Sequence, residues 1–85
     1  MYIITYDIGG DKERAKVVKC VEQYCLRVQK SVWLGDLSGH ALKKLCSNLK
    51  NLEIESGIVD IWEAGKPQRI GNGPPIPEIY SCHVA

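Results

Sequence analysis

The hydrophobic positions of this 85-residue chain change their spacing several times, and each change marks a new structural element. Residues 2–8 are apolar on both alternating faces, which is typical of a central β-strand. Gly9 and Gly10 interrupt this pattern before Asp11, which we expect to cap a helix. Asp7 stands near the strand end, where burying an unpaired charge is costly, so it is a candidate for function.

Residues 12–25 follow a helical period. One apolar stripe, which we expect to be buried, consists of Val17, Val18, Val21, Tyr24 and Cys25. A separate polar stripe, which we expect to face water, consists of Lys12, Lys16, Lys19 and Gln23. Arg14 lies at the margin of the apolar stripe. Because this helix begins beside the tip of the first strand, we expect Arg14 to lie close to Asp7.

Residues 26–37 are rich in side chains that favour β-structure. The pattern fits either two short strands, separated near Lys30 and Ser31, or one bent strand. Ser38 then predicts the N-cap of a second helix, with three lysines pointing outward. The apolar stripe of this helix consists of Leu42, Leu45, Cys46, Leu49 and Leu52.

The last part of the chain predicts a strand at residues 57–63 and a glycine- and proline-rich arm at residues 64–77. A short strand at residues 79–84 follows. The order β-α-(β-β)-α-β fits an α+β fold, a ferredoxin-like two-layer sandwich. We expect residues 1–63 to form this domain and residues 64–85 to form an arm with a C-terminal strand at a dimer interface.

Oligomeric state follows from the same arrangement. Both helices would cover one face of the sheet and leave tyrosine, isoleucine, valine or tryptophan side chains exposed on the other. A monomer of this size tolerates a large exposed apolar face poorly. We therefore expect a homodimer that is joined through this face or through the tail strands.

Composition indicates a globular protein, with 45% hydrophobic and 25% charged residues. Because the sequence shows neither a membrane-spanning run nor a signal peptide, we expect a cytoplasmic protein that does not contact membranes. The four cysteines lack Cys-x-x-Cys spacing, so we interpret them as reduced and mostly buried rather than as zinc ligands. They are Cys20, Cys25, Cys46 and Cys82.

Charge is segregated along the chain although the net charge is only +1. A segregated basic face can bind phosphates even in a nearly neutral protein. The candidate phosphate contacts are Lys12, Arg14, Lys16, Lys19, Arg27 and Lys30. The alternative for each exposed lysine is simple solvation. Neither His40 nor His83 has a partner that would suggest a catalytic role.

Four separated motifs together resemble the Cas2 family, the second universal family of CRISPR-associated proteins. They are Tyr6-Asp7-Ile8, Asp11-Lys-Glu-Arg14, Leu26-Arg-Val-Gln-Lys-Ser-Val-Trp33 and Gly35-Asp-Leu-Ser38. The resemblance covers roughly residues 1–63. Members of this family are small ferredoxin-like dimers that work beside the Cas1 integrase when new spacers are acquired.

The resemblance implies roles for particular residues. Asp7 matches a strand-end aspartate, of which each protomer contributes one to a shared Mg²⁺ or Mn²⁺ ion at the dimer axis. Arg14 matches a first-helix arginine, and Lys16 falls where some members carry another basic residue. Gly9 and Gly10 depart from the family, because a serine or threonine followed by aspartate is common there.

The resemblance extends to the second strand region. Arg27 and Ser31 match its motif, Tyr6 matches the aromatic neighbour of the aspartate, and Trp33 replaces a more usual phenylalanine. From residue type alone, Tyr6 and Trp33 are core or interface aromatics, and Ser31 either donates to a phosphate or sits in a turn.

Two linked functions follow from the resemblance, namely a metal-dependent endonuclease that cuts RNA or DNA, and an adaptor that holds duplex DNA between Cas1 dimers. A toxin-like messenger-RNA interferase of related fold is the alternative. For Asp7 itself, the alternative is a structural role, as a cap of the following turn or as the partner of Arg14.

Overall fold

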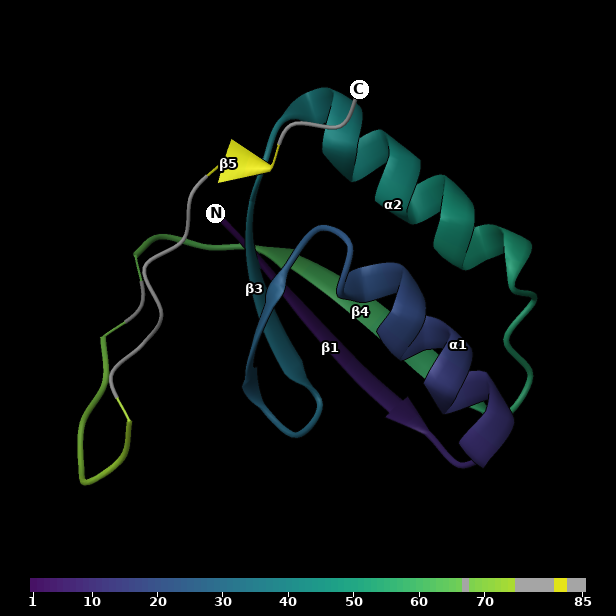
Figure 1. Ribbon diagram of the computed structural model, residues 1–85, viewed down its shortest axis with the longest axis horizontal. Helices are drawn as coiled ribbons and strands as arrows, with labels where there is room; N and C mark the ends of the chain where they lie inside the picture. The colour runs from purple at the N-terminus through teal and green to yellow at the C-terminus, as the bar shows by residue number, and fades with distance from the viewer. Residues whose placement is uncertain (67, 75–80, 83–85) are drawn as a thin grey trace.

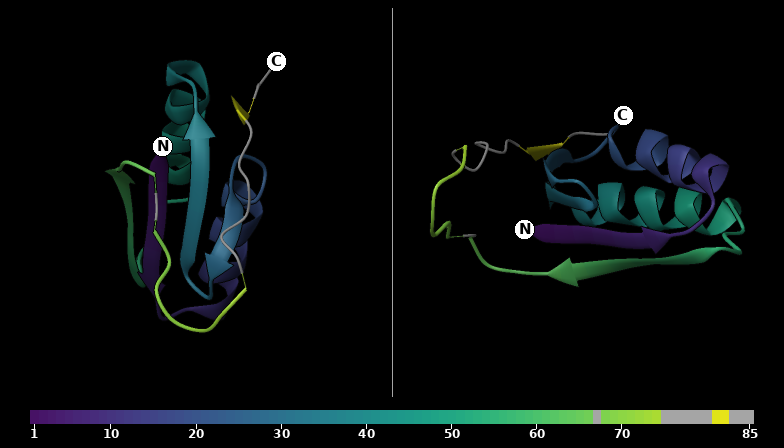
Figure 2. Two further views of the ribbon diagram at one scale, coloured as in Figure 1. Left: turned by 90° about the vertical axis from the view of Figure 1, so that its left-hand side faces the viewer. Right: turned by 90° about the horizontal axis from the view of Figure 1, so that it is seen from below.

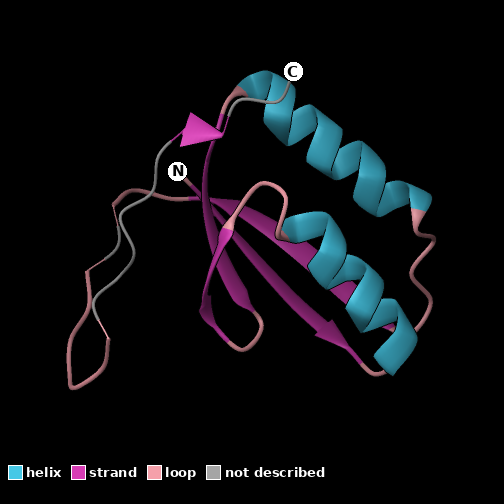
Figure 3. Ribbon diagram, viewed as in Figure 1, coloured by secondary structure: helices cyan, strands magenta, loops and turns pink. Residues whose placement is uncertain are grey.

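The computed structural model describes residues 1–66, 68–74 and 81–82 of the chain. Within these residues, two helices lie side by side on one face of a β-sheet, as Figures 1 and 3 show. The elements are β1 (Tyr2–Ile8), α1 (Asp11–Val21), β2 (Leu26–Gln29), β3 (Val32–Leu37), α2 (Gly39–Asn51), β4 (Gly57–Glu63) and β5 (Ser81–Cys82).

The sheet has the strand order β2-β3-β1-β4, and these four strands are antiparallel. β1 therefore occupies a central position, as its apolar pattern predicts. This order and the β-α-β-β-α-β succession are consistent with the predicted ferredoxin-like fold. The two helices form one layer and the sheet the other, which is clearest in the right-hand view of Figure 2.

The region between the helices resolves into a hairpin. β2 and β3 pair antiparallel across a turn at Lys30 and Ser31, so the first of the two alternatives for residues 26–37 is confirmed. β5 pairs in parallel with the end of β3, where Ser81 lies opposite Asp36 and Cys82 opposite Leu37. The other residues of the predicted strand at 79–84 lie outside the described part of the chain.

The helix ends follow local hydrogen bonding. The prediction that Asp11 caps α1 is wrong, because the Arg14 amide donates to the Gly10 carbonyl, which makes Gly10 the N-cap and Asp11 the first helical residue. α1 also ends at Val21 rather than at residue 25, because the following residues form a turn. Ser38 caps α2 as predicted, and its hydroxyl accepts from the Ala41 amide at 3.1 Å.

The core lies between the helices and the sheet. Its most completely buried side chains are Ile4, Val17, Val21 and Leu45. Cys20 and Cys25 are buried, as expected, and burial raises the pKa of Cys20. Cys20 was not among the residues predicted for the apolar stripe of α1, but it is buried with them in the same core. Neither helix in the described residues is long and apolar enough to cross a membrane.

The tip of β1 is fixed by a tight junction with residues 55–57. Glu13 of α1 accepts hydrogen bonds from the Glu55 and Ser56 amides, both at 2.8 Å, and from the Ser56 hydroxyl. The hydroxyl contributes most to lowering the pKa of Glu13, followed by the two amides. At Gly57, a Cβ would lie 2.0 Å from the Asp7 carbonyl oxygen, so this position requires glycine. The junction therefore holds the backbone of Asp7 in place.

A candidate nucleic-acid interface

A groove of about 530 Å³ lies beside α1 and the β2–β3 hairpin. Arg14 and Lys19 line it from α1, and Arg27 and Lys30 from the hairpin. Two acidic residues, Asp11 and Glu22, line it as well. The fold thus brings together side chains that are separated in sequence and makes a cationic groove. Four of the six predicted phosphate contacts, Arg14, Lys19, Arg27 and Lys30, lie in it.

The other two predicted contacts do not line this groove. Lys12 borders a neighbouring hollow together with Glu13 and Ser56, and Lys16 is exposed elsewhere on α1. Lys30 lines the groove from the hairpin turn. The position of Lys30 in the hairpin turn, opposite α1, could not be inferred from linear spacing.

Arg14 has a structural role as well as a place in the groove. Its Nη1 donates to the Ile8 carbonyl at 2.8 Å, and its Nη2 forms an ion pair with Asp11. Its guanidinium therefore reaches the tip of β1, as expected. However, its carboxylate partner is Asp11, and the alternative in which Arg14 pairs with Asp7 is wrong.

The Tyr6 hydroxyl organises the floor of the groove. It donates to the Lys30 carbonyl at 3.3 Å and accepts from Arg27 Nη2 at 3.2 Å and from Trp33 Nε1 at 3.3 Å. Tyr6 and Trp33 are buried, which confirms the prediction of core aromatics. Ser31 contributes its backbone carbonyl, which accepts from the Tyr6 amide at 3.3 Å.

Arg27 is exposed but held in a defined position. Its guanidinium lies 4.7 Å from the centre of the Trp33 ring, where a cation–π contact is favourable. Arg27 and Trp33 are cross-strand partners between β2 and β3, so the hairpin register creates this contact. Packing on Trp33 and hydrogen bonding to Tyr6 leave the guanidinium oriented at the groove surface. Sequence analysis identified all three residues but not the hydroxyl that connects them.

Asp7 lies on the opposite face of the sheet. Successive side chains of a strand alternate between faces, so Asp7 points away from the core that buries Tyr6 and Ile8. Asp7 is exposed, and the expectation of a costly buried charge at this strand end is wrong. The sheet therefore separates Asp7 from the cationic groove.

The face that carries Asp7 is open and apolar. Asp7 is the register partner of Ile58, and Thr5 that of Asp60. Ile58 is 60% exposed and Trp62 56% exposed, while Trp62 Nε1 donates to the Thr5 hydroxyl at 3.2 Å. In Figure 2, both helices lie on the other side of the sheet. The exposed isoleucine and tryptophan match the prediction for this face.

One chain supplies few ligands for a metal ion at Asp7. Within the described residues, no group of three or more histidine, cysteine, aspartate or glutamate side chains is suitably placed. Mg²⁺ needs only one or two carboxylates when water and phosphate oxygens complete its shell. Asp7 could therefore supply one carboxylate ligand to such an ion, but the described part of one chain does not supply a complete site.

The fold and these surfaces define a small ferredoxin-like α+β protein with a cationic groove on one side and an acidic, apolar sheet face on the other. The family model for CRISPR associated protein Cas2 matches residues 1–63, and the chain belongs to this family.

Individual relatives and a solved structure agree with this assignment. The chain is 36% identical over 81 residues to "CRISPR-associated endoribonuclease Cas2 1" of Chloroflexus aurantiacus, covering 87% of each protein. It is also 36% identical over 83 residues to "CRISPR-associated endoribonuclease Cas2 2" of Pyrobaculum aerophilum, covering 88% of this chain and 91% of that one. The hypothetical protein TT1823 of Thermus thermophilus superposes with a TM-score of 0.76 at 30% identity, over 86% of this chain and 92% of the other.

Proposed function

We propose that this chain is a homodimeric nucleic-acid-binding protein of CRISPR adaptation that also has metal-dependent endonuclease activity. The observation that carries this proposal is the division of the sheet into two sides. The cationic groove suits a phosphate backbone, whereas the other face presents a carboxylate among exposed apolar side chains. The names of the two relatives, both called endoribonucleases, favour RNA as the substrate.

The open face supports the dimer. Ile58 and Trp62 are more than half exposed, and a second copy packed on this face would remove them from water. The same packing would bring the Asp7 side chains of two protomers toward each other. Residues 64–85 would add to this interface. Two carboxylates that approach without a cation repel each other, so such an interface favours a bound metal ion.

A metal ion held by the Asp7 pair, Mg²⁺ or Mn²⁺, would supply an activated water molecule and neutralise charge on the scissile phosphate. The protein's own residues have separate roles in this proposal. Asp7 would provide the oxygen ligand. Arg27 and Lys30 bind backbone phosphates in the groove, on the other side of the sheet from Asp7.

The adaptor function would use the basic surfaces. In this role the dimer holds duplex DNA through Lys12, Lys16 and the groove cations, and it bridges Cas1 integrase dimers during spacer acquisition in the cytoplasm. Backbone contacts of this kind are independent of sequence, which suits the capture of varied foreign DNA. Membership of the Cas2 family favours this interpretation over a toxin-like messenger-RNA interferase.

A cleavage assay tests the proposal. The full chain is incubated with labelled RNA and DNA in Mg²⁺, in Mn²⁺ and in EDTA. We expect cleavage of RNA with a divalent ion and none in EDTA, because Asp7 alone cannot activate water. Cleavage that continues in EDTA would contradict the metal-dependent mechanism. Binding of duplex DNA without any cleavage would remove the nuclease function and leave the adaptor.

A further inference from the structure

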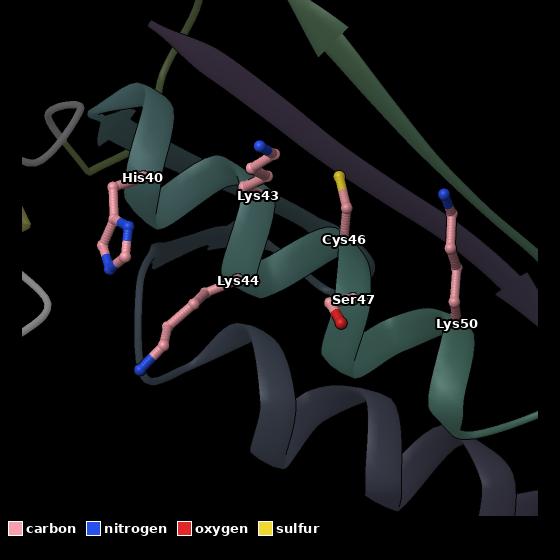
Figure 4. Close-up of a pocket in the computed structure, with 6 residues that line it drawn as sticks. All are labelled: His40, Lys43, Lys44, Cys46, Ser47 and Lys50. Atoms are coloured by element: carbon pink, nitrogen blue, oxygen red, sulfur yellow. The ribbon is translucent and has the colours of Figure 1, made fainter.

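The outer face of α2 carries a second concentration of positive charge. His40, Lys43, Lys44 and Lys50 border a shallow hollow of about 480 Å³, together with Cys46 and Ser47. Figure 4 shows Lys43 and Lys50 along one flank of the helix and His40 and Lys44 along the other. The buried residues of α2 face the opposite way, toward the core. We call these four basic residues, His40, Lys43, Lys44 and Lys50, the lysine array. The array is therefore directed at solvent and is separate from the groove beside α1.

The charge of α2 is unusual for this chain. Residues 39–51 contain three of its 11 lysines and arginines and none of its 10 aspartates and glutamates. The helix thus carries +3, and the rest of the chain carries −2. Within the described residues, no ion pair involves any of the three lysines. The lysine array is the most strongly basic surface element of a protein that is otherwise slightly acidic.

Helix stability does not account for this array. The helix dipole favours acidic residues in the first turn and basic ones in the last, and only Lys50 fits that preference. Lys43 and Lys44 lie in the first half of α2, where they have no acidic partner three or four residues away. The neighbouring charges repel one another in the isolated protein. A polyanion bound to this face would relieve the repulsion.

We propose that the outer face of α2 binds the phosphate backbone of a double-stranded nucleic acid. This inference rests on the proposed function, in which the protein binds nucleic acid. From His40 to Lys50 the array spans ~15 Å of helix axis. This length matches roughly four base-pair steps of ~3.4 Å. The face presents no phenylalanine, tyrosine or tryptophan, whereas proteins that bind single strands use such rings to stack on bases. Lysine ammonium groups act as point charges toward phosphates and suit a contact without sequence preference.

Charge-neutral and charge-conserving variants of the same positions test the inference. Affinity for a duplex of arbitrary sequence is measured as a function of salt for the wild type, for Lys43→Gln/Lys50→Gln and for Lys43→Arg/Lys50→Arg. The glutamine variant should bind more weakly, and its plot of log affinity against log salt should be shallower by ~1.8, or ~0.9 for each lost phosphate contact. The arginine variant should retain the wild-type slope. Circular dichroism confirms that each variant remains helical.

The groove variant Arg27→Gln separates this inference from the proposed function. A wild-type protein that binds no nucleic acid would overturn both. If the wild type binds and Arg27→Gln weakens binding, but Lys43→Gln/Lys50→Gln retains wild-type affinity and slope, only the role of α2 is overturned. The array would then suit an acidic protein instead. If Lys43→Gln/Lys50→Gln loses as much affinity for a single strand of the same length as for the duplex, the assignment to a duplex is contradicted.

Discussion

Replacing Asp7 with asparagine is expected to lower metal-dependent cleavage by more than ~100-fold while the fold persists. Loss of a residue that only supports a metal ligand typically costs 10–100-fold in metal affinity or activity, so loss of the ligand itself should cost more. Asp7 is exposed, and no ion pair of the described chain involves it, so the uncharged side chain should be accommodated. Initial cleavage rates with Mg²⁺, measured beside thermal unfolding, check both parts.

Asp60→Asn is the matched control. Asp60 is an exposed carboxylate on the same sheet face and belongs to the next strand, opposite Thr5. The same change in charge at this position should leave most of the cleavage rate intact. Undiminished cleavage by the Asp7 variant would remove Asp7 from the mechanism. An equal loss in both variants would show that the charge of the face matters rather than a ligand at residue 7.

Replacing Tyr6 with phenylalanine is expected to reduce both stability and nucleic-acid affinity. Removing the hydroxyl leaves the buried Trp33 N–H without its acceptor, which costs ~1–3 kcal/mol. For a domain of this size, each kcal/mol lowers the melting temperature by ~4–8 °C. Arg27 also loses the hydrogen bond that orients it. Ordering one long side chain costs ~0.5–1.5 kcal/mol on binding, which corresponds to a roughly 2- to 12-fold rise in Kd.

Tyr24→Phe provides the comparison. Tyr24 is also a buried tyrosine, and its hydroxyl accepts from Asn48 of α2 at 3.5 Å, whereas Arg27 donates to the Tyr6 hydroxyl. This variant should lose stability but keep the wild-type affinity for nucleic acid at a temperature where both variants are folded. If Tyr6→Phe binds as tightly as Tyr24→Phe, the Tyr6 hydroxyl supports the core and does not position Arg27.

Much of the fold could be predicted because its signals are local. The two-sided apolar pattern of residues 2–8, the serine cap at Ser38 and the strand at residues 57–63 each depend on neighbouring residues. Helix α1, which ends at Val21 rather than at residue 25, shows where local signals fail. Tyr24 and Cys25 continue the apolar period of α1, yet they are buried from a turn, because burial does not require helical backbone.

The site was less predictable, since it depends on strand register and on which face a side chain occupies. The basic residues of the groove were identified from the sequence. That Lys30 lies close to the basic residues of α1 depends on the hairpin turn, which the sequence pattern left open. Asp7 was identified from its position at a strand end, whereas its exposure follows from alternation and from the helices covering only one face. Glu13, which joins α1 to Ser56, has no local sequence signal.

We propose different roles for the two faces of the sheet, in which the helix side would hold the polyanion and the open side would join two protomers. In the proposed mechanism one chain offers only Asp7 to the shared metal ion, so we expect cleavage to require the second copy. The most direct test is the mass of the full chain by light scattering, at the concentration at which cleavage is measured. A dimer predicts about twice the 9.5 kDa of one chain. A cleaving species with the mass of a single chain would contradict the shared metal site.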